Sequence, residues 1–277
     1  MNVIKALWIR NLRAFWRNKP ALIFNLAFPF FFVFVFSSIF QGAIALMLAG
    51  IIIATVFDSS LRVSSNTIDD MTSGFMKEVL VSPISRLTIA VGQFASSATV
   101  GTVQGLLIYL IGMVLFESVR PTSVFTVIFV VLAMIFVGLI FAGFGLLIAS
   151  KAKNMQTFQA VSLAITMPMT FISGAYIPLS SLPIPLQWVG RFNPMSYAVH
   201  FFRDIAVNRP DPDALMILTI EQDVIFTFWG LTITPMLSII FMAAFGAIFL
   251  ILSTITFTRV DFSKMARNKA DVADMWN

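Results

Sequence analysis

The chain has 277 residues, of which 58% are hydrophobic and only 11% are charged, with a formal net charge of +5. Soluble domains carry about 25% charged residues, so this composition excludes a water-soluble fold and predicts an integral membrane protein. Cysteine is absent and His200 is the single histidine, which argues against a disulfide framework, a thiol nucleophile and a metal centre. We therefore expect no cofactor to bind this chain directly.

Residues 1–19 predict an amphipathic helix rather than a cleavable signal peptide, because they contain five basic residues and no long apolar core. Ile4, Leu7 and Trp8 belong to an apolar set that recurs at helical spacing, while Arg10 and Arg13 fall largely elsewhere on the helical wheel. Such a helix lies in the headgroup layer. Two roles stay open for it: fixing orientation, or connecting the membrane domain to a cytosolic partner.

Long stretches without charge predict six membrane-spanning helices. Pro20 to Phe57 contains no charged residue and, at about 1.5 Å per residue, is far longer than the roughly 30 Å hydrocarbon core. Gln41-Gly42 lies in its middle, so we expect a tight turn there between two helices. The predicted spans are residues 21–40, 43–61, 88–116, 122–149, 155–173 and 229–257. The fold class is therefore an all-α membrane domain over residues 1–277.

The basic residues indicate how the spans are oriented. With six spans, fourteen of the 18 basic residues fall on one face, which the positive-inside rule makes cytoplasmic. These are Lys5, Arg10, Arg13, Arg17, Lys19, Arg62, Lys77, Arg86, Lys151, Lys153, Arg259, Lys264, Arg267 and Lys269. Both termini, including the tail 258–277, are then expected in the cytoplasm of a cell with this protein in its inner (plasma) membrane. The same asymmetry explains the net charge without a nucleic-acid partner.

The loop 62–87 is the longest expected on the cytoplasmic face. Residues 75–81 can form a short helix that Pro83 ends, since the residue before a proline avoids the α region. Phe75 and Leu80 lie there beside the charges of Lys77 and Glu78. Exposed apolar side chains among charges suit docking into a groove on another protein.

The segment 174–223 is expected on the opposite face. Pro178, Pro183, Pro185 and Pro194 prevent one long helix, and two short helices around 179–190 and 194–207 fit the sequence between them. Helix-breaking backbone at membrane depth persists only where protein or a water-filled path satisfies it. We therefore expect a re-entrant segment at the mouth of a pathway.

Motifs for common catalytic chemistry do not occur in the sequence. It has no GxxxxGK[ST] phosphate loop, no HExxH and no GxSxG with partners, and Asp58 is the only acid near the interior of a span. Ion-coupled carriers need ionisable groups inside the membrane, so their scarcity argues against a secondary transporter and against an intramembrane hydrolase. We predict a transport subunit that is not itself an enzyme and takes its energy from a partner.

Three regions of the sequence resemble a known family, and they occur in the order and positions expected for it. The chain resembles the membrane subunits of ABC-2-type ABC transporters, also called type V exporters, over nearly its full length. The similar residues are the start Trp16-Arg17-Asn18-Lys19-Pro20, then Gly74, Lys77-Glu78, Leu80, Ser82-Pro83 and Arg86, and after the fifth span Ser173-Gly174, Pro178, Leu182-Pro183, Leu186-Gln187, Pro194, Tyr197 and Arg203. Gln93 departs from the pattern, since relatives often carry lysine there, and the acidic insertion 211–223 is a second difference.

The resemblance implies partners and site residues. Two permease subunits, identical or paralogous, would pair within membrane lipid, each on a cytosolic ATPase subunit that binds ATP-Mg. Residues 70–86 would dock into that ATPase, with a smaller second contact at 150–157. The implied ATPase-coupling residues are Gly74, Phe75, Lys77, Glu78, Leu80, Pro83 and Arg86. The implied residues of the external gate are Gly174, Pro178, Pro183, Pro194, Tyr197 and Arg203.

The expected function is export of an amphipathic or hydrophobic, drug-like compound from the cytoplasm or the inner leaflet. A lipid-linked polysaccharide is the alternative substrate, because aromatic side chains can stack on sugars. An ion-coupled carrier or channel and a non-transporting scaffold are alternatives of a different class. The spans hold no ring of charges that would select an ion.

Overall fold

The computed structural model of the chain describes residues 3–39, 44–72, 85–121, 123–206, 227–228, 231–232 and 235–259. These residues are almost entirely helical. The helices are α1 (Val3–Arg17), α2 (Lys19–Ile39), α3 (Ile44–Val63), α4 (Ser65–Thr72), α6 (Arg86–Leu115), α7 (Val124–Lys151), α8 (Met155–Phe171), α9 (Ile184–Arg191), α10 (Pro194–Ala206) and α12 (Pro235–Arg259), with 3-10 turns η1 (Glu117–Val119) and η2 (Leu179–Ser181). Strands β1 (Thr227–Phe228) and β2 (Leu231–Thr232) pair antiparallel.

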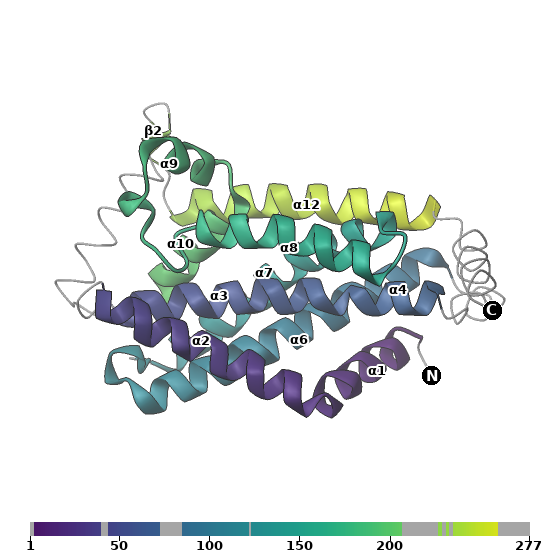
Figure 1. The fold of residues 1–277 in the computed structure, drawn as a ribbon, viewed down its shortest axis with the longest axis horizontal. Helices are drawn as coiled ribbons and strands as arrows, with labels where there is room; N and C mark the ends of the chain where they lie inside the picture. Colours follow the sequence, from purple (N-terminus) through teal and green to yellow (C-terminus); the bar gives the residue numbers. More distant parts are fainter. Residues whose placement is uncertain are drawn as a thin grey trace.

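The long helices lie roughly along the longest axis of the molecule (Figure 1). Helices α9 and α10 lie at one end, which we call the α10 end, and α1 and α4 lie towards the other, which we call the α4 end. α3 packs against α6, α7 and α10, and α7 packs against α12. This arrangement makes α3 the centre of the bundle.

Four helices within the described residues are long and apolar enough to cross a membrane: Ile44–Met71, Arg86–Leu115, Val124–Lys151 and Leu237–Arg259. A fifth candidate is the pair Ile4–Arg17 and Lys19–Val35, which bends by 75° between its two helices. The bend separates the amphipathic α1 from the apolar α2, as the sequence predicts. The molecule is therefore a multi-pass helical membrane protein.

Two expected boundaries are wrong. The loop predicted from residue 62 is helical at its start, because α4 packs Ile68 and Met71 into the interior. The last helix, predicted from residue 229, begins only at Pro235, and Leu231–Thr232 belongs to β2 instead. Proline is favourable in the first turn of a helix, and the residue before it avoids the α region, so the helix starts at Pro235.

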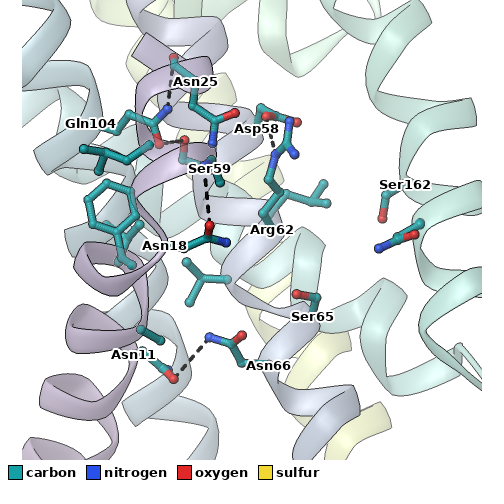
Figure 2. Close-up of a pocket in the computed structure, with 18 of the residues that line it drawn as sticks. Asn11, Asn18, Asn25, Asp58, Ser59, Arg62, Ser65, Asn66, Gln104 and Ser162 are labelled. Carbon is teal, nitrogen blue, oxygen red and sulfur yellow. Dashed lines mark hydrogen bonds and ion pairs between the residues drawn. The ribbon is translucent and has the colours of Figure 1, made fainter.

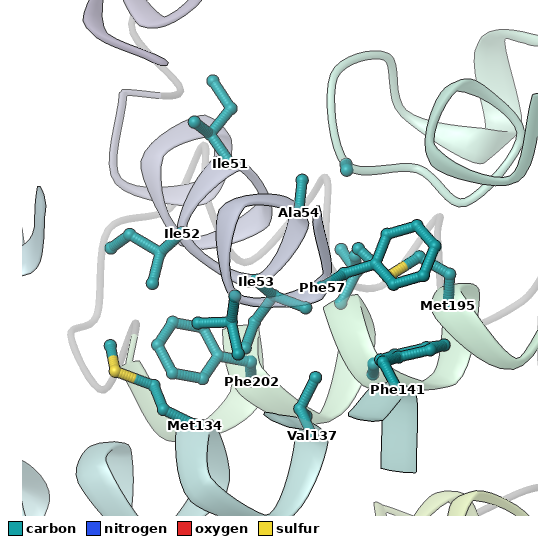
Figure 3. Close-up of a cluster of buried hydrophobic side chains, with 14 of the residues drawn as sticks. Ile51, Ile52, Ile53, Ala54, Phe57, Met134, Val137, Phe141, Met195 and Phe202 are labelled. Atoms are coloured by element: carbon teal, nitrogen blue, oxygen red, sulfur yellow. The ribbon is translucent and has the colours of Figure 1, made fainter. Parts of the chain in front are cut away.

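The core around α3 is a continuous apolar cluster (Figure 3). Ile53 and Phe57 of α3 lie against the α7 residues Val137 and Phe141, and the Phe57 and Phe141 rings are 4.4 Å apart between centroids. Phe202 of α10 packs into the same cluster. Because lipid is as apolar as these side chains, close packing rather than hydrophobicity must hold the helices together.

Small residues allow α6 to approach its neighbours closely. A Cβ atom added at Gly105 would lie 2.5 Å from Val56 Cγ2 of α3, and one added at Gly138 of α7 would lie 3.0 Å from the Ala98 Cα of α6. Gly101 and Gly105 form the four-residue spacing of small residues that is common at membrane helix contacts. Larger side chains at these positions would separate the helices.

Candidate functional site

The turn after α8 and the buried arginine of α10 form the first part of the site. Gly174 has a φ of 86°, a conformation that side chains disfavour, and its carbonyl accepts a 2.8 Å hydrogen bond from Arg203 Nη2. Arg203 Nε donates to the Leu46 carbonyl of α3 at 3.0 Å, and the arginine is only 1% exposed. Gly50 must be small, because its Cβ would lie 2.5 Å from the Ala175 carbonyl oxygen. One guanidinium thus joins α3, the Gly174 turn and α10.

Polar contacts fix where α10 begins. Asn193 Oδ1 accepts from the Met195 backbone nitrogen at 3.0 Å, and its Nδ2 donates to the Met169 carbonyl of α8 at 2.6 Å. Pro194 is the first helical residue, where a missing N–H is not needed. The Tyr197 hydroxyl donates to the Arg191 carbonyl at 2.6 Å, and its ring stacks on Phe241 of α12.

The remaining residues predicted at the gate lie along the same segment. Pro178 precedes η2 and Pro183 precedes α9, so each proline occupies the position before a short helix. α10 lies close to the predicted range 194–207, whereas the range 179–190, predicted as one helix, is divided at Pro183 into η2 and α9. The gate residues therefore belong to one folded unit at the α10 end. Their role in gating remains a prediction.

Of the predicted ATPase-coupling residues, only Arg86 lies in the part of the chain that the structure describes. Gly74, Phe75, Lys77, Glu78, Leu80 and Pro83 lie outside the described residues. Arg86 Nη1 donates a 2.6 Å hydrogen bond to the Thr258 carbonyl in the last turn of α12. The guanidinium thus binds the C-terminal end of a helix, where carbonyl groups lack helical partners. Arg86 has an internal structural role whatever else it contacts.

Helix α1 is clamped to α4 and α6 by polar contacts that the sequence did not predict. Arg10 donates two hydrogen bonds to the Asp70 carboxylate, at 2.8 and 2.6 Å. Asn11 donates to Gln93 Oε1 of α6 at 3.0 Å and accepts from Asn66 Nδ2 of α4 at 3.3 Å. We call Arg10, Asp70, Asn11 and Asn66 the α1–α4 latch. Gln93, the position that departs from the family pattern, thus anchors α1 by a neutral hydrogen bond.

A polar cavity of about 600 Å³ lies near the latch, among α1, α2, α3, α4, α6 and α8 (Figure 2). Six carboxamide and four hydroxyl side chains line it, together with Asp58, Arg62 and nine apolar residues. The amides and hydroxyls are Asn11, Asn18, Asn25, Asn66, Gln104, Gln159, Ser59, Ser65, Ser162 and Thr166. Asn11, Asn18 and Asn25 recur every seventh residue. This seven-residue spacing of asparagines is the sequence signal for the cavity. It is easily missed because these side chains carry no charge.

Gln104, which is held by Ser59, compensates for a backbone hydrogen bond that α2 lacks. Pro29 has no N–H to donate to the Asn25 carbonyl four residues earlier, so that carbonyl lacks its helical partner. Gln104 Nε2 of α6 donates to it at 3.3 Å, and Gln104 Oε1 accepts from the Ser59 hydroxyl at 2.6 Å. The three helices that form one wall of the cavity are therefore tied together (Figure 2).

Helix α8 carries a polar stripe on its inner face. Ser162, Thr166 and Thr170 are buried at four-residue spacing, while Leu163 and Met167 are exposed. The stripe begins in the cavity and runs to Ser173, beside the Gly174 turn, over about 17 Å at 1.5 Å per residue. The Thr170 and Ser173 hydroxyls donate to the Thr166 and Thr170 carbonyls at 2.8 and 2.6 Å, whereas Ser162 Oγ, at the cavity, has no hydrogen-bond partner among the described residues.

These features define a multi-pass membrane protein in which a polar cavity is connected, along one helix, to a folded segment at the other end. The model of the ABC-2 type transporter family matches residues 2–207, and the chain belongs to this family. It is therefore a membrane transport permease.

Its relatives carry names of the same kind. The ycf38 transport permease of Cyanophora paradoxa is 27% identical over 199 residues, which cover 68% of each chain. Nodulation protein J of Rhizobium leguminosarum bv. viciae is 22% identical over 74% of this chain and 82% of its own length. The inner membrane transport permease YadH of Escherichia coli K12 is 23% identical over 72% of this chain and 81% of its own.

Proposed function

We propose that this permease is the membrane-spanning subunit of an ATP-driven exporter, which moves an amphipathic or hydrophobic compound out of the cytoplasm or the inner leaflet. The observation that carries the proposal is the polar stripe of α8, which runs from the cavity to the Gly174 turn. Polar surface inside a membrane protein is costly unless water or polar cargo uses it. The stripe begins at Ser162, whose buried hydroxyl has no hydrogen-bond partner among the described residues, and this end of the stripe supports a path for polar groups.

We propose six crossings, with α1 lying in the headgroup layer and α8 supplying the sixth. α8 has 17 residues, about 26 Å at 1.5 Å per residue, which is close to the roughly 30 Å hydrocarbon thickness. The distribution of basic residues supports a cytoplasmic position for both termini and the α4 end of an inner-membrane protein. The α10 end becomes the external gate, with α9 and α10 as the re-entrant helices.

The energy would come from two copies of a cytosolic ATPase subunit that bind ATP-Mg, because this sequence has no phosphate-binding loop. The subunits would dock on the loop between α4 and α6. Both ends of that loop are held by the membrane domain: Asp70 binds Arg10 of α1, and Arg86 binds the end of α12. Movement of the loop would therefore reach α1 and α12 directly. A second permease copy or a paralogue would complete the pathway.

An ion-coupled carrier is the competing class, and Asp58 would be its coupling acid. Asp58 is paired with Arg62 at 2.7 Å, and their side chains are 41% and 61% exposed. A carboxylate that is already neutralised by a neighbour in hydrated space is a poor proton-coupling group. Transport that survives ATP depletion and collapses with the proton gradient would favour this competitor.

Glu78→Lys tests the assignment of the coupling loop. We expect the variant, assembled with its ATPase, to keep ATP hydrolysis but lose most substrate transport, because the wrong charge faces the docking surface. Glu117→Lys, at the α10 end, is the matched control and should transport normally. Equal coupling in both variants would contradict the docking role. ATP-dependent transport by the purified permease alone would contradict the need for a second polypeptide.

A further inference from the structure

We propose that the polar cavity binds the uncharged, hydroxyl- or amide-rich head group of an amphiphile. The idea deepens the proposed function by naming a substrate class, and as a statement about transport it depends on that function. As a statement about binding it stands by itself. The volume of about 600 Å³ lies in the range of small-molecule pockets.

The chemistry of the lining selects the head group. Six carboxamides can each donate and accept hydrogen bonds, and so can four hydroxyls. A polyol or an amide sugar offers donors and acceptors at comparable density. Its hydrogen bonds to the lining can therefore replace those of the water that it displaces. A purely apolar head would leave those lining groups that have no partner within the protein unsatisfied, at a cost of about 1–3 kcal/mol each.

The charge of the lining argues for an uncharged ligand. Asp58 and Arg62 are the charged residues of the cavity, and they neutralise each other at 2.7 Å. A cationic or anionic head group would have to separate this pair or remain without a counter-charge. Neither cost applies to a neutral head group.

Some lining groups hold the fold and others are available to a ligand. Gln104, Ser59 and Asn11 are used in contacts between helices. By contrast, Ser162 Oγ on the opposite wall is buried without a hydrogen-bond partner among the described residues, and Figure 2 shows it facing the cavity. A buried hydroxyl without a partner is unfavourable, and a polar ligand would satisfy it.

The walls also provide a place for an apolar tail. α2 and α8 form opposite walls of the cavity, and Leu22 and Leu163 line it from these two helices. Beyond the cavity, Phe24 and Phe28 of α2 and Met167 of α8 are exposed, as expected for surfaces in contact with lipid. An amphiphile can therefore keep its tail in the bilayer while its head group occupies the cavity.

The test is equilibrium binding of three probes with the same ten-carbon tail: decyl maltoside, decyl sulfate and decyltrimethylammonium. The full-length permease is placed in lipid nanodiscs, and empty nanodiscs give the partitioning into lipid alone. We expect saturable binding of decyl maltoside, at least tenfold tighter than binding of either charged probe. Equal binding of all three, or tighter binding of a charged one, would overturn the proposal.

A matched pair of variants locates the binding. Gln159 and Gln156 are both exposed on α8, but only Gln159 lines the cavity. We expect Gln159→Leu to weaken maltoside binding about fivefold, the effect of one lost hydrogen bond, and Gln156→Leu to leave it unchanged. Because both side chains are exposed, both variants should fold. Equal affinities in the two variants would show that the probe binds elsewhere and would refute the site.

Asp58→Asn tests the charge argument. The substitution leaves Arg62 without its carboxylate, so the cavity becomes positive and decyl sulfate should bind at least tenfold tighter than to the wild type. An unchanged preference for maltoside would refute the argument from charge. Neutral-probe binding without ATP-dependent transport would leave the site intact and defeat the exporter assignment. ATP-dependent transport without maltoside binding would support the exporter assignment and refute the binding site.

Discussion

Gln104 supplies the hydrogen-bond donor that Pro29 withholds from the Asn25 carbonyl, and Arg203 supplies two donors to carbonyls at the Gly174 turn and in α3. In lipid, no water is present to satisfy such groups, so side chains must do it. Both residues are long and polar, and both are buried. Gln104 and Arg203 therefore serve first to satisfy backbone carbonyls within the membrane.

The Gln104 contact can be isolated by a double-mutant cycle with Pro29. Gln104→Leu should destabilise the permease by about 1–2 kcal/mol, because the Asn25 carbonyl and the Ser59 hydroxyl lose their partner. Pro29→Ala restores a backbone donor to Asn25, so the loss should be about 1 kcal/mol smaller in that background. Thermal unfolding in detergent measures all four proteins. Strictly additive effects would show that Gln104 does not serve this carbonyl.

Arg203 should be among the least replaceable residues. Arg203→Met removes two charge-assisted hydrogen bonds of about 1.5–3 kcal/mol each in soluble proteins, so we expect a thermal midpoint lower by several degrees or failure to fold. Arg203→Lys keeps the charge but cannot reach both carbonyls, and should be intermediate. Arg120→Met, at an exposed arginine directly after η1, should change stability by less than about 0.5 kcal/mol. Equal stability of the three variants would be incompatible with the observed contacts.

Helices α1 and α8 are amphipathic in opposite senses. α1 turns Leu7 towards Gly92 of α6 and exposes Lys5, Arg13 and Arg17, as expected of a helix in the headgroup layer. α8 instead exposes Met167 and buries Ser162, as expected of a helix between lipid and polar space. Periodicity in the sequence identifies the first pattern. The second requires knowing which face of α8 lies inside.

The α1–α4 latch should behave as a specific ion pair. Arg10→Asp or Asp70→Arg alone should destabilise the protein, because each places like charges together near buried surface. The combined swap, Arg10→Asp with Asp70→Arg, should recover at least half of the loss. Thermal unfolding provides the readout, and Arg13→Asp, elsewhere on the same helix, is the control for charge alone. Failure of the swap to recover stability would mean that the pair does not interact in the membrane.

The whole molecule has two chemically different ends. The α4 end holds the latch and the cavity, and the α10 end holds α9 and α10, of which α10 packs on α3, α7 and α12. α8 connects them, since its first turn follows Lys151 and its last turn leads into Gly174. The proposed direction of transport follows from this polarity together with the basic residues near the α4 end.

The sidedness can be measured directly because the chain has no cysteine. Single cysteines at Lys153 and Arg120 should react with a membrane-impermeant maleimide from opposite sides of the membrane: Lys153→Cys only after the membrane is opened, and Arg120→Cys in intact cells. Their positions before α8 and after η1 place them at opposite ends of long helices. Labelling of both from the same side would contradict the six-crossing topology.

The sequence by itself determined the class of protein, the bend between α1 and α2, and the proline-delimited helices α9 and α10, because these follow from local composition and from the fixed geometry of proline. The sequence did not reveal the polar cavity, the latch or the tie between Gln104 and Asn25. Each of these joins residues of different helices, such as Arg10 with Asp70 or Ser59 with Gln104. Uncharged polar side chains look alike along the chain, and only the packing of the helices decides which of them meet and which face open space.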